Sequence, residues 1–168
     1  MKKAGIGCLA GVILFGLVLG YFIYSQKEKD NEVISNGEEI VITAYDEGKR
    51  MIRLKYEIGN KSFDKSTGKE YSGIEDGEQF RGLYLPSDPE SFLVFFDQPF
   101  LSDKYNYQET ACLSVTKELS VLKFTYKVGD ERFERRTVYN ENQSLSSSNY
   151  IVKYRIENPK IGYLISKE

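Results

Sequence analysis

The chain has 168 residues, a formal net charge of −2 and no histidine. The lack of histidine excludes Ser-His-Asp and Cys-His catalysis and histidine metal sites, and it removes the commonest general base near neutral pH. A mildly acidic chain also lacks the positive surface that concentrates nucleic acid, so we expect no nucleic-acid partner.

The first predicted element is a membrane helix, because residues 4–24 carry no charge. At about 1.5 Å per residue this segment spans roughly 31 Å as a helix, close to the hydrocarbon thickness of a bilayer. The alternative is a cleaved signal peptide, which requires a shorter apolar run followed by small residues. The bulky residues Tyr21-Phe22-Ile23-Tyr24 stand where a cleavage site would require small residues. Residues 1–24 are therefore predicted to form an uncleaved signal-anchor, a single-pass transmembrane helix.

The charges beside this segment predict its orientation. Lys2 and Lys3 precede it, which favours a cytoplasmic N-terminus and an extracytoplasmic C-terminal domain at the cell membrane. Lys27 and Lys29 on the other side oppose this bias. Two Gly-x-x-x-Gly pairs within the segment also permit a weak homodimer through the helix.

Residues 25–37 are polar and are predicted to form a tether, after which the chain repeats at an offset of 70 residues. Leu54 to Phe63 aligns with Phe124 to Phe133, with Tyr56 on Tyr126 and Gly59 on Gly129. The same offset, without a gap, places Tyr84 on Tyr154 and Asp88-Pro89 on Asn158-Pro159. We interpret this as an internal duplication, with residues 38–107 as the first β repeat with its linker and residues 108–168 as the second.

The residue pattern inside each repeat predicts strands. Apolar and polar residues alternate along residues 52–58 and 122–128, as in half-buried strands, and Gly59-Asn60 and Gly129-Asp130 then supply hairpin turns. Further strands are predicted at 39–45, 80–85 and 92–96, and at 110–115, 150–156 and 161–165. Proline is predicted to end the ladders of the strands at 80–85 and 150–156, at Asp88-Pro89 and Asn158-Pro159. The predicted fold of the part after the helix is all-β, with two tandem antiparallel units of about five strands, each a small barrel or a curled sheet.

The repeated motif is Tyr-x-Ile/Val-Gly-Asn/Asp-x-x-Phe followed by Tyr-x-x-x-Asp/Asn-Pro. It resembles the motifs of membrane-associated bacterial β-rich modules that are known only as domains of unknown function. Those modules have a Tyr-x-Val-x-Gly-Lys-x-Tyr hairpin, and the residue between valine and glycine is missing here. The resemblance implies a β-rich fold beside a membrane and implies no activity.

Residues with catalytic or metal-binding chemistry are scarce. One cysteine, Cys112, follows the helix, so a zinc site of cysteine and histidine ligands is excluded, and there is no phosphate-binding glycine motif. We therefore predict no metal, no cofactor and no catalytic residue. Glycosidases need only two carboxylates, and three acidic groups qualify by residue type: Glu38-Glu39, Asp46-Glu47 and Glu75-Asp76-Gly77-Glu78. Their positions in predicted turns and strand ends favour solvated carboxylates.

Aromatic residues carry two further predictions. Tyr56, Tyr84, Tyr126 and Tyr154 lie on the apolar phase of their strands, which favours a core position over a stacking platform for a ligand. The segment that joins the repeats, residues 97–107, contains Phe100, Leu101, Tyr105 and Tyr107. These either pack against the repeats or form an exposed patch for a partner, and we favour packing.

The function predicted from these features is a single-pass, membrane-anchored binding or assembly module of the cell envelope. It is not an enzyme, and its protein partner is unidentified. The alternative is a carboxylate-dependent enzyme that acts on envelope glycans. The two differ in whether acidic side chains converge in a pocket.

Overall fold

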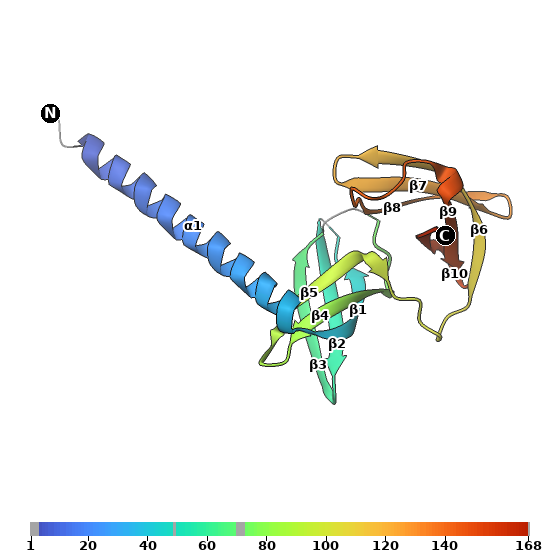
Figure 1. Ribbon diagram of the computed structural model, residues 1–168, viewed down its shortest axis with the longest axis horizontal. Helices are drawn as coiled ribbons and strands as arrows, with labels where there is room; N and C mark the ends of the chain where they lie inside the picture. The colour runs from blue at the N-terminus through green and yellow to red at the C-terminus, as the bar shows by residue number, and fades with distance from the viewer. Residues whose placement is uncertain (1–3, 49, 70–72, 168) are drawn as a thin grey trace. The chain divides into compact units, whose positions relative to one another are not determined.

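The computed structural model describes residues 4–48, 50–69 and 73–167, with side chains from residue 15 onward. One helix, α1 (Ala4–Asn36), precedes ten strands (Figure 1). The strands are β1 (Glu38–Asp46), β2 (Met51–Ile58), β3 (Lys61–Gly68), β4 (Glu78–Leu85), β5 (Asp88–Pro99), β6 (Tyr107–Glu118), β7 (Val121–Val128), β8 (Glu131–Val138), β9 (Tyr150–Arg155) and β10 (Asn158–Ser166), and a 3-10 turn, η1, covers Ser147–Asn149.

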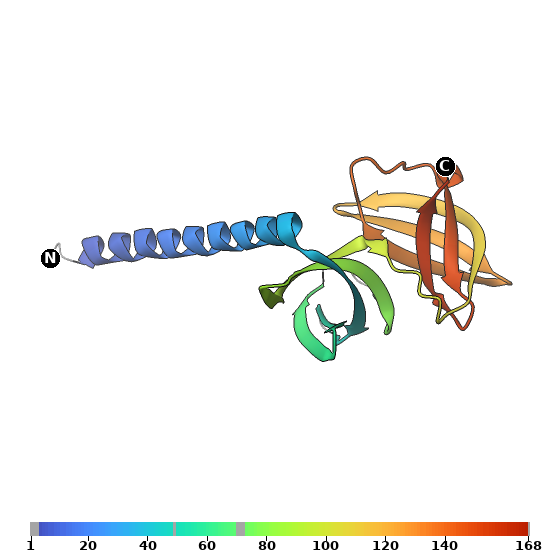
Figure 2. The same ribbon diagram turned by 60° about the horizontal axis from the view of Figure 1, so that its bottom comes forward.

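The ten strands form two five-stranded antiparallel sheets of the same topology. Their orders are β3-β2-β1-β4-β5 and β10-β9-β6-β7-β8, which match when each strand of the first repeat is replaced by the fifth strand after it. The turned view in Figure 2 shows both groups of strands curled rather than flat. The predicted all-β fold of two curled five-stranded units is confirmed.

The two leading hairpins are equivalent down to the residue pair. Tyr56 lies opposite Phe63 in β2 and β3, and Tyr126 lies opposite Phe133 in β7 and β8. Each tyrosine ring stacks on its partner, with ring centroids 5.2 Å and 5.5 Å apart. The predicted core positions of the tyrosines are confirmed, because Tyr56 and Tyr126 are 3% and 0% exposed and their later counterparts Tyr84 and Tyr154 are also buried.

The predicted ladder-ending role of the prolines is wrong. Pro89 and Pro159 are the second residues of β5 and β10, and the turns lie just before these strands. Both strands are at an edge of their sheet, where a residue needs to bond a neighbour on one side only. Proline is therefore tolerated near their starts.

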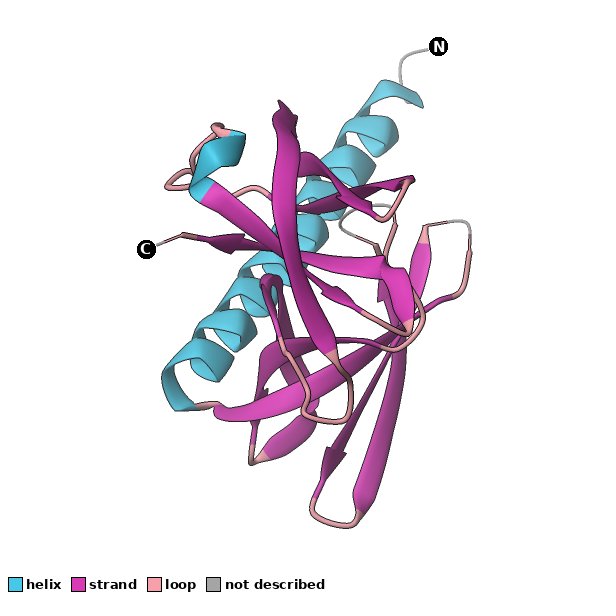
Figure 3. Cartoon of the chain, turned by 90° about the vertical axis from the view of Figure 1, so that its right-hand side faces the viewer, coloured by secondary structure: helices cyan, strands magenta, loops and turns pink. Residues whose placement is uncertain are grey.

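The predicted transmembrane helix is also wrong as a separate element. Helix α1 runs without interruption for 33 residues, through the segment predicted to be a tether (Figure 3). The charged residues Lys27 to Asp30 lie within this same helix. In the described part of the chain, no helix combines the length and the apolar character needed to cross a membrane. The side chains of residues 4–14, including the first glycine pair, lie outside the description.

The chain divides into two compact units, residues 1–38 with 83–93, and residues 39–82 with 94–168. In the first unit, the chain just after α1 lies against the end of β4. Gly37 donates its N–H to the Val33 carbonyl at 2.8 Å. A Cβ at Gly37 would lie 2.2 Å from that oxygen and 3.1 Å from Leu83 Cβ, so only glycine fits there. Tyr84 donates its hydroxyl to Glu38 at 2.7 Å.

Candidate functional site

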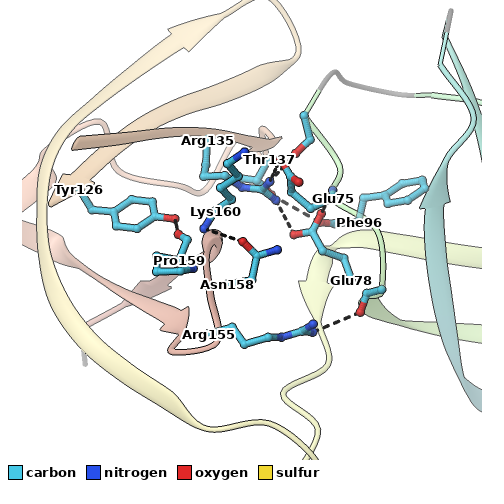
Figure 4. Close-up of polar contacts among 12 residues, drawn as sticks. Glu75, Glu78, Phe96, Tyr126, Arg135, Thr137, Arg155, Asn158, Pro159 and Lys160 are labelled. Carbon is cyan, nitrogen blue, oxygen red and sulfur yellow. Dashed lines mark hydrogen bonds and ion pairs between the residues drawn. The ribbon is translucent and has the colours of Figure 1, made fainter. Parts of the chain in front are cut away.

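A buried polar cluster lies in the second unit, where β4 of the first sheet meets β8 and β9 of the second (Figure 4). Its charged members are Glu78, Arg135 and Arg155, which are 0%, 5% and 5% exposed. Charged side chains are rarely this buried unless they are paired, so their contacts decide what the cluster does.

Glu78 and Arg135 form the central ion pair of this cluster. Arg135 Nη2 contacts Glu78 Oε1, and Arg135 Nη1 donates to the Gly73 carbonyl. The other carboxylate oxygen of Glu78 accepts the Glu75 backbone N–H at 2.7 Å. Glu75 itself lies 4.0 Å from Arg135 and is partly exposed. Both oxygens of Glu78 are thus engaged, and its charge is compensated.

The strand pattern explains why Arg135 is buried. In β8 it lies opposite Phe124 of β7, in the same row of pairs as Tyr126 and Phe133. This row belongs to the apolar face of the second sheet, where an arginine must find a carboxylate. Glu78 at the start of β4 supplies it from 57 residues away.

Further hydrogen bonds lie around this ion pair. Thr137 Oγ1 donates to the Phe96 carbonyl at 3.4 Å, and Arg155 Nη2 donates to the Gly77 carbonyl at 3.2 Å. Tyr126 donates its hydroxyl to the Pro159 carbonyl at 2.5 Å, and burial raises the pKa of this tyrosine well above its usual value. The cluster therefore fixes the two sheets to each other by polar contacts.

The space inside this cluster is small. A cavity of about 20 Å³ is lined by Glu78, Arg135 and Tyr163, among other residues. This volume accommodates about one water molecule, which occupies at least roughly 10–15 Å³ by the same measure. A sugar ring does not fit, so Glu78 has no access to a glycan.

The other predicted carboxylate candidates lie on the surface, where they form local hydrogen bonds and ion pairs. The carboxylate of Asp46 accepts hydrogen bonds from Lys69 Nζ and from the Gly48 N–H. These bonds, with the larger effect from Lys69, hold the pKa of the Asp46 carboxyl below its usual value. A general acid for glycoside cleavage needs a raised pKa, so Asp46 is unsuited to that role. Glu47 accepts a hydrogen bond from Ser66 at 2.7 Å, and Asp76 accepts the Asp46 N–H at 2.7 Å.

Glu38 and Glu39 are similarly occupied. Glu38 accepts a hydrogen bond from the Tyr84 hydroxyl, and Glu39 lies 3.8 Å from Arg81 on the exposed surface. Among the described residues, no cluster of three acidic or cysteine side chains has the geometry of a metal site.

A larger groove, of about 530 Å³, lies on the first sheet. Tyr45 is one of its walls, and the cations of Arg53 and Lys55 lie 5.7 Å and 5.5 Å from the centre of its ring. Glu57 and Lys104 bring opposite charges to the same groove. Its mixed polar lining is suited to contact with a polar surface.

The apolar linker residues are half-buried, which is intermediate between packing against the repeats and forming an exposed patch. Phe100, Leu101, Tyr105 and Tyr107 all have intermediate exposure. The Phe100 N–H donates to the Gln79 carbonyl at 2.8 Å, and the Tyr105 ring lies 3.5 Å below the Arg155 guanidinium. These contacts favour the packing interpretation.

A second candidate surface is on α1. Eight large apolar side chains of this helix between residues 15 and 24 are exposed: Phe15, Leu17, Val18, Leu19, Tyr21, Phe22, Ile23 and Tyr24. Successive helix positions differ by about 100° in direction, so these residues cover every side of the helix. Exposed apolar surface of this kind marks an interaction site.

Sequence reasoning missed Arg135 and Arg155 as site residues and assigned Glu78 to a solvated turn. For Arg135, the available signal was its position two residues after Phe133, on the same phase of β8. No protein-family model, curated protein or solved structure matches the chain.

Proposed function

We propose that the chain is a non-catalytic binding or assembly module that attaches to a membrane through the apolar segment of α1, with its β part available to a protein partner. The observation that carries this proposal is the apolar surface around residues 15–24, where Phe15, Tyr21 and Phe22 are 68%, 71% and 69% exposed. A helix that is apolar on every side is stable only when its surroundings cover it.

The chemistry of the β part supports a non-catalytic role. Its buried carboxylate, Glu78, is neutralised by Arg135 in a cavity the size of a water molecule. Asp46, Glu39 and Glu47 of the predicted acidic groups contact a lysine, an arginine and a serine hydroxyl, respectively. These contacts do not arrange an acid and a base around an open cleft, and no specific observation favours the glycan-cleaving alternative.

The test is flotation of the full chain with phosphatidylcholine vesicles in a density gradient. We expect the wild-type chain to float with the vesicles. A variant with Phe15→Ser, Leu19→Ser, Phe22→Ser and Ile23→Ser should stay in the dense fractions, because serine removes the apolar area that favours transfer out of water.

A matched control uses exposed apolar residues of the β part. Leu119, Leu145 and Ile156 are 93%, 51% and 51% exposed. The triple serine variant at these positions should float as the wild-type chain does. Equal loss of flotation in both variants, or a wild-type chain that does not float, would contradict attachment through α1.

A further inference from the structure

Arg155 is a buried cation without a directly paired carboxylate among the described residues. It is 5% exposed, donates from Nη2 to the Gly77 carbonyl, and stacks on Tyr105. Within the described ranges it has no carboxylate within ion-pair distance, and its Nε has no hydrogen-bond acceptor. A buried charge without a counter-ion is costly, and Arg155 holds its proton at any physiological pH.

Two tyrosine hydroxyls lie on the same face of the sheet as Arg155. Tyr107 of β6 is directly opposite Arg155 in the strand register. Tyr163 of β10 is opposite Lys153, two residues before Arg155, so its side chain leaves the sheet on the same side. The centroids of the two rings are 6.4 Å apart.

Both hydroxyls are buried and have no hydrogen-bond partner among the residues that the structure describes. Burial, above all, raises the pKa of Tyr163, so this hydroxyl keeps its proton and is a donor. Arg155 Nε is likewise only a donor. The three groups therefore offer N–H and O–H donors for which the described residues supply no acceptor.

The nearby carboxylates are already committed. Glu78 is compensated by Arg135 and accepts the Glu75 N–H. Glu157 is exposed, and its carboxylate is bound by its own N–H and by Asn106, which lower its pKa with a smaller contribution from Arg155. Neither carboxylate thus forms a direct ion pair with Arg155.

We propose that a small monovalent anion, with chloride as its physiological form, binds between Arg155, Tyr107 and Tyr163 and accepts hydrogen bonds from Nε and the two hydroxyls. A water molecule would satisfy these donors and leave Arg155 without a direct counter-ion. The three donor atoms are shielded from solvent, which favours a small ion over phosphate or an organic anion.

The first test is thermal unfolding of the full chain in detergent, with sodium chloride exchanged for sodium gluconate at constant ionic strength. Gluconate is much larger than chloride and cannot replace it at donors that are shielded from solvent, so the comparison separates binding from general screening. Chloride should raise the Tm by about 3 °C or more and the effect should saturate, as for a ligand that binds only the folded state. Equal Tm values in the two salts would overturn the proposal.

The variants Tyr107→Phe and Tyr163→Phe, combined, should lose this chloride-specific increase because two of the three donors are gone. The matched control is Tyr154→Phe, since the hydroxyl of Tyr154 donates to Gln108 at 2.7 Å, away from the proposed site. The control should respond to chloride as the wild type does. A chloride response that persists in the double variant would place the anion elsewhere and overturn the assignment.

A second measurement does not depend on the folding of any variant. Crystals of the wild-type chain grown in bromide should show an anomalous peak within hydrogen-bond distance of Arg155 Nε. Density at that position without anomalous signal would identify a water molecule and refute the anion site.

Discussion

At the scale of single residues, Glu78 and Arg135 form the central buried ion pair. The side chains of both are almost completely buried, at 0% and 5% exposure. In such a place the attraction between the charges compensates their desolvation, and removal of one partner leaves the other charge buried alone. The pair thus makes the join between the two sheets sensitive to a single substitution.

Glu78→Gln should therefore lower the free energy of unfolding by roughly 3–5 kcal/mol, because it leaves the Arg135 guanidinium without its buried counter-ion. Urea denaturation of the full chain in detergent measures the change. The control is Asp64→Asn in the exposed pair Lys55–Asp64, whose atoms are 3.5 Å apart. That substitution should cost less than about 1 kcal/mol. Similar losses in both variants would show that burial does not strengthen the Glu78–Arg135 contact.

At the scale of elements, the two hairpins depend on the same backbone conformation. Gly59 and Gly129 have φ angles of 58° and 59°, and the residues after them have negative φ. A positive φ at the first turn residue alone is the feature of the type II′ turn, which follows the twist of antiparallel strands. Both repeats thus use glycine for the same reason.

Gly129→Ala and Gly59→Ala should each destabilise the fold by about 1–2 kcal/mol, since a Cβ is strained in the left-handed region. Gly68→Ala is the control, because Gly68 has no positive φ and nothing within 4 Å of an added Cβ. It should be neutral or slightly stabilising. Thermal unfolding of the three variants decides, and an equal loss at Gly68 would show that turn geometry is not the cause.

The linker between the sheets gives a third prediction. Phe100 is half-buried, so Phe100→Ala should cost less than the roughly 3–5 kcal/mol that emptying a fully buried phenylalanine site costs, and clearly more than zero. The midpoint of urea denaturation measures this. A midpoint that does not move would instead assign the linker aromatics to an exposed patch for a partner.

The strands were predictable and the polar cluster was not, for a physical reason. The alternation of apolar and polar residues along 52–58 and 122–128 indicates which side chains are buried. The offset of 70 residues then pairs equivalent residues of the two hairpins, as in the structure. Arg135 aligns with Lys65, which is exposed in β3, so the repeat gave no sign that the arginine is buried. Its partner Glu78 is distant in sequence, and only the packing of the two sheets brings them together.

At the scale of the whole molecule, the chain combines two contrasting surfaces. The β sheets bury their aromatic rows and pair their charges, whereas α1 exposes its apolar residues from Phe15 to Tyr24. The described helix side chains also show why α1 was misjudged from the sequence: charged residues from Lys27 onward continue the same helix instead of forming a tether. The proposed role rests on this contrast.

The most direct test of the proposed role uses tryptophan as a reporter, because the chain contains none. Phe22→Trp places the reporter on the apolar segment of α1, and Leu119→Trp places it on the exposed β6–β7 turn. On addition of phosphatidylcholine vesicles, we predict that the emission of the Phe22→Trp chain shifts to shorter wavelength while that of the Leu119→Trp chain is unchanged. An unchanged spectrum for the tryptophan at position 22, or equal shifts at both positions, would contradict attachment through the helix.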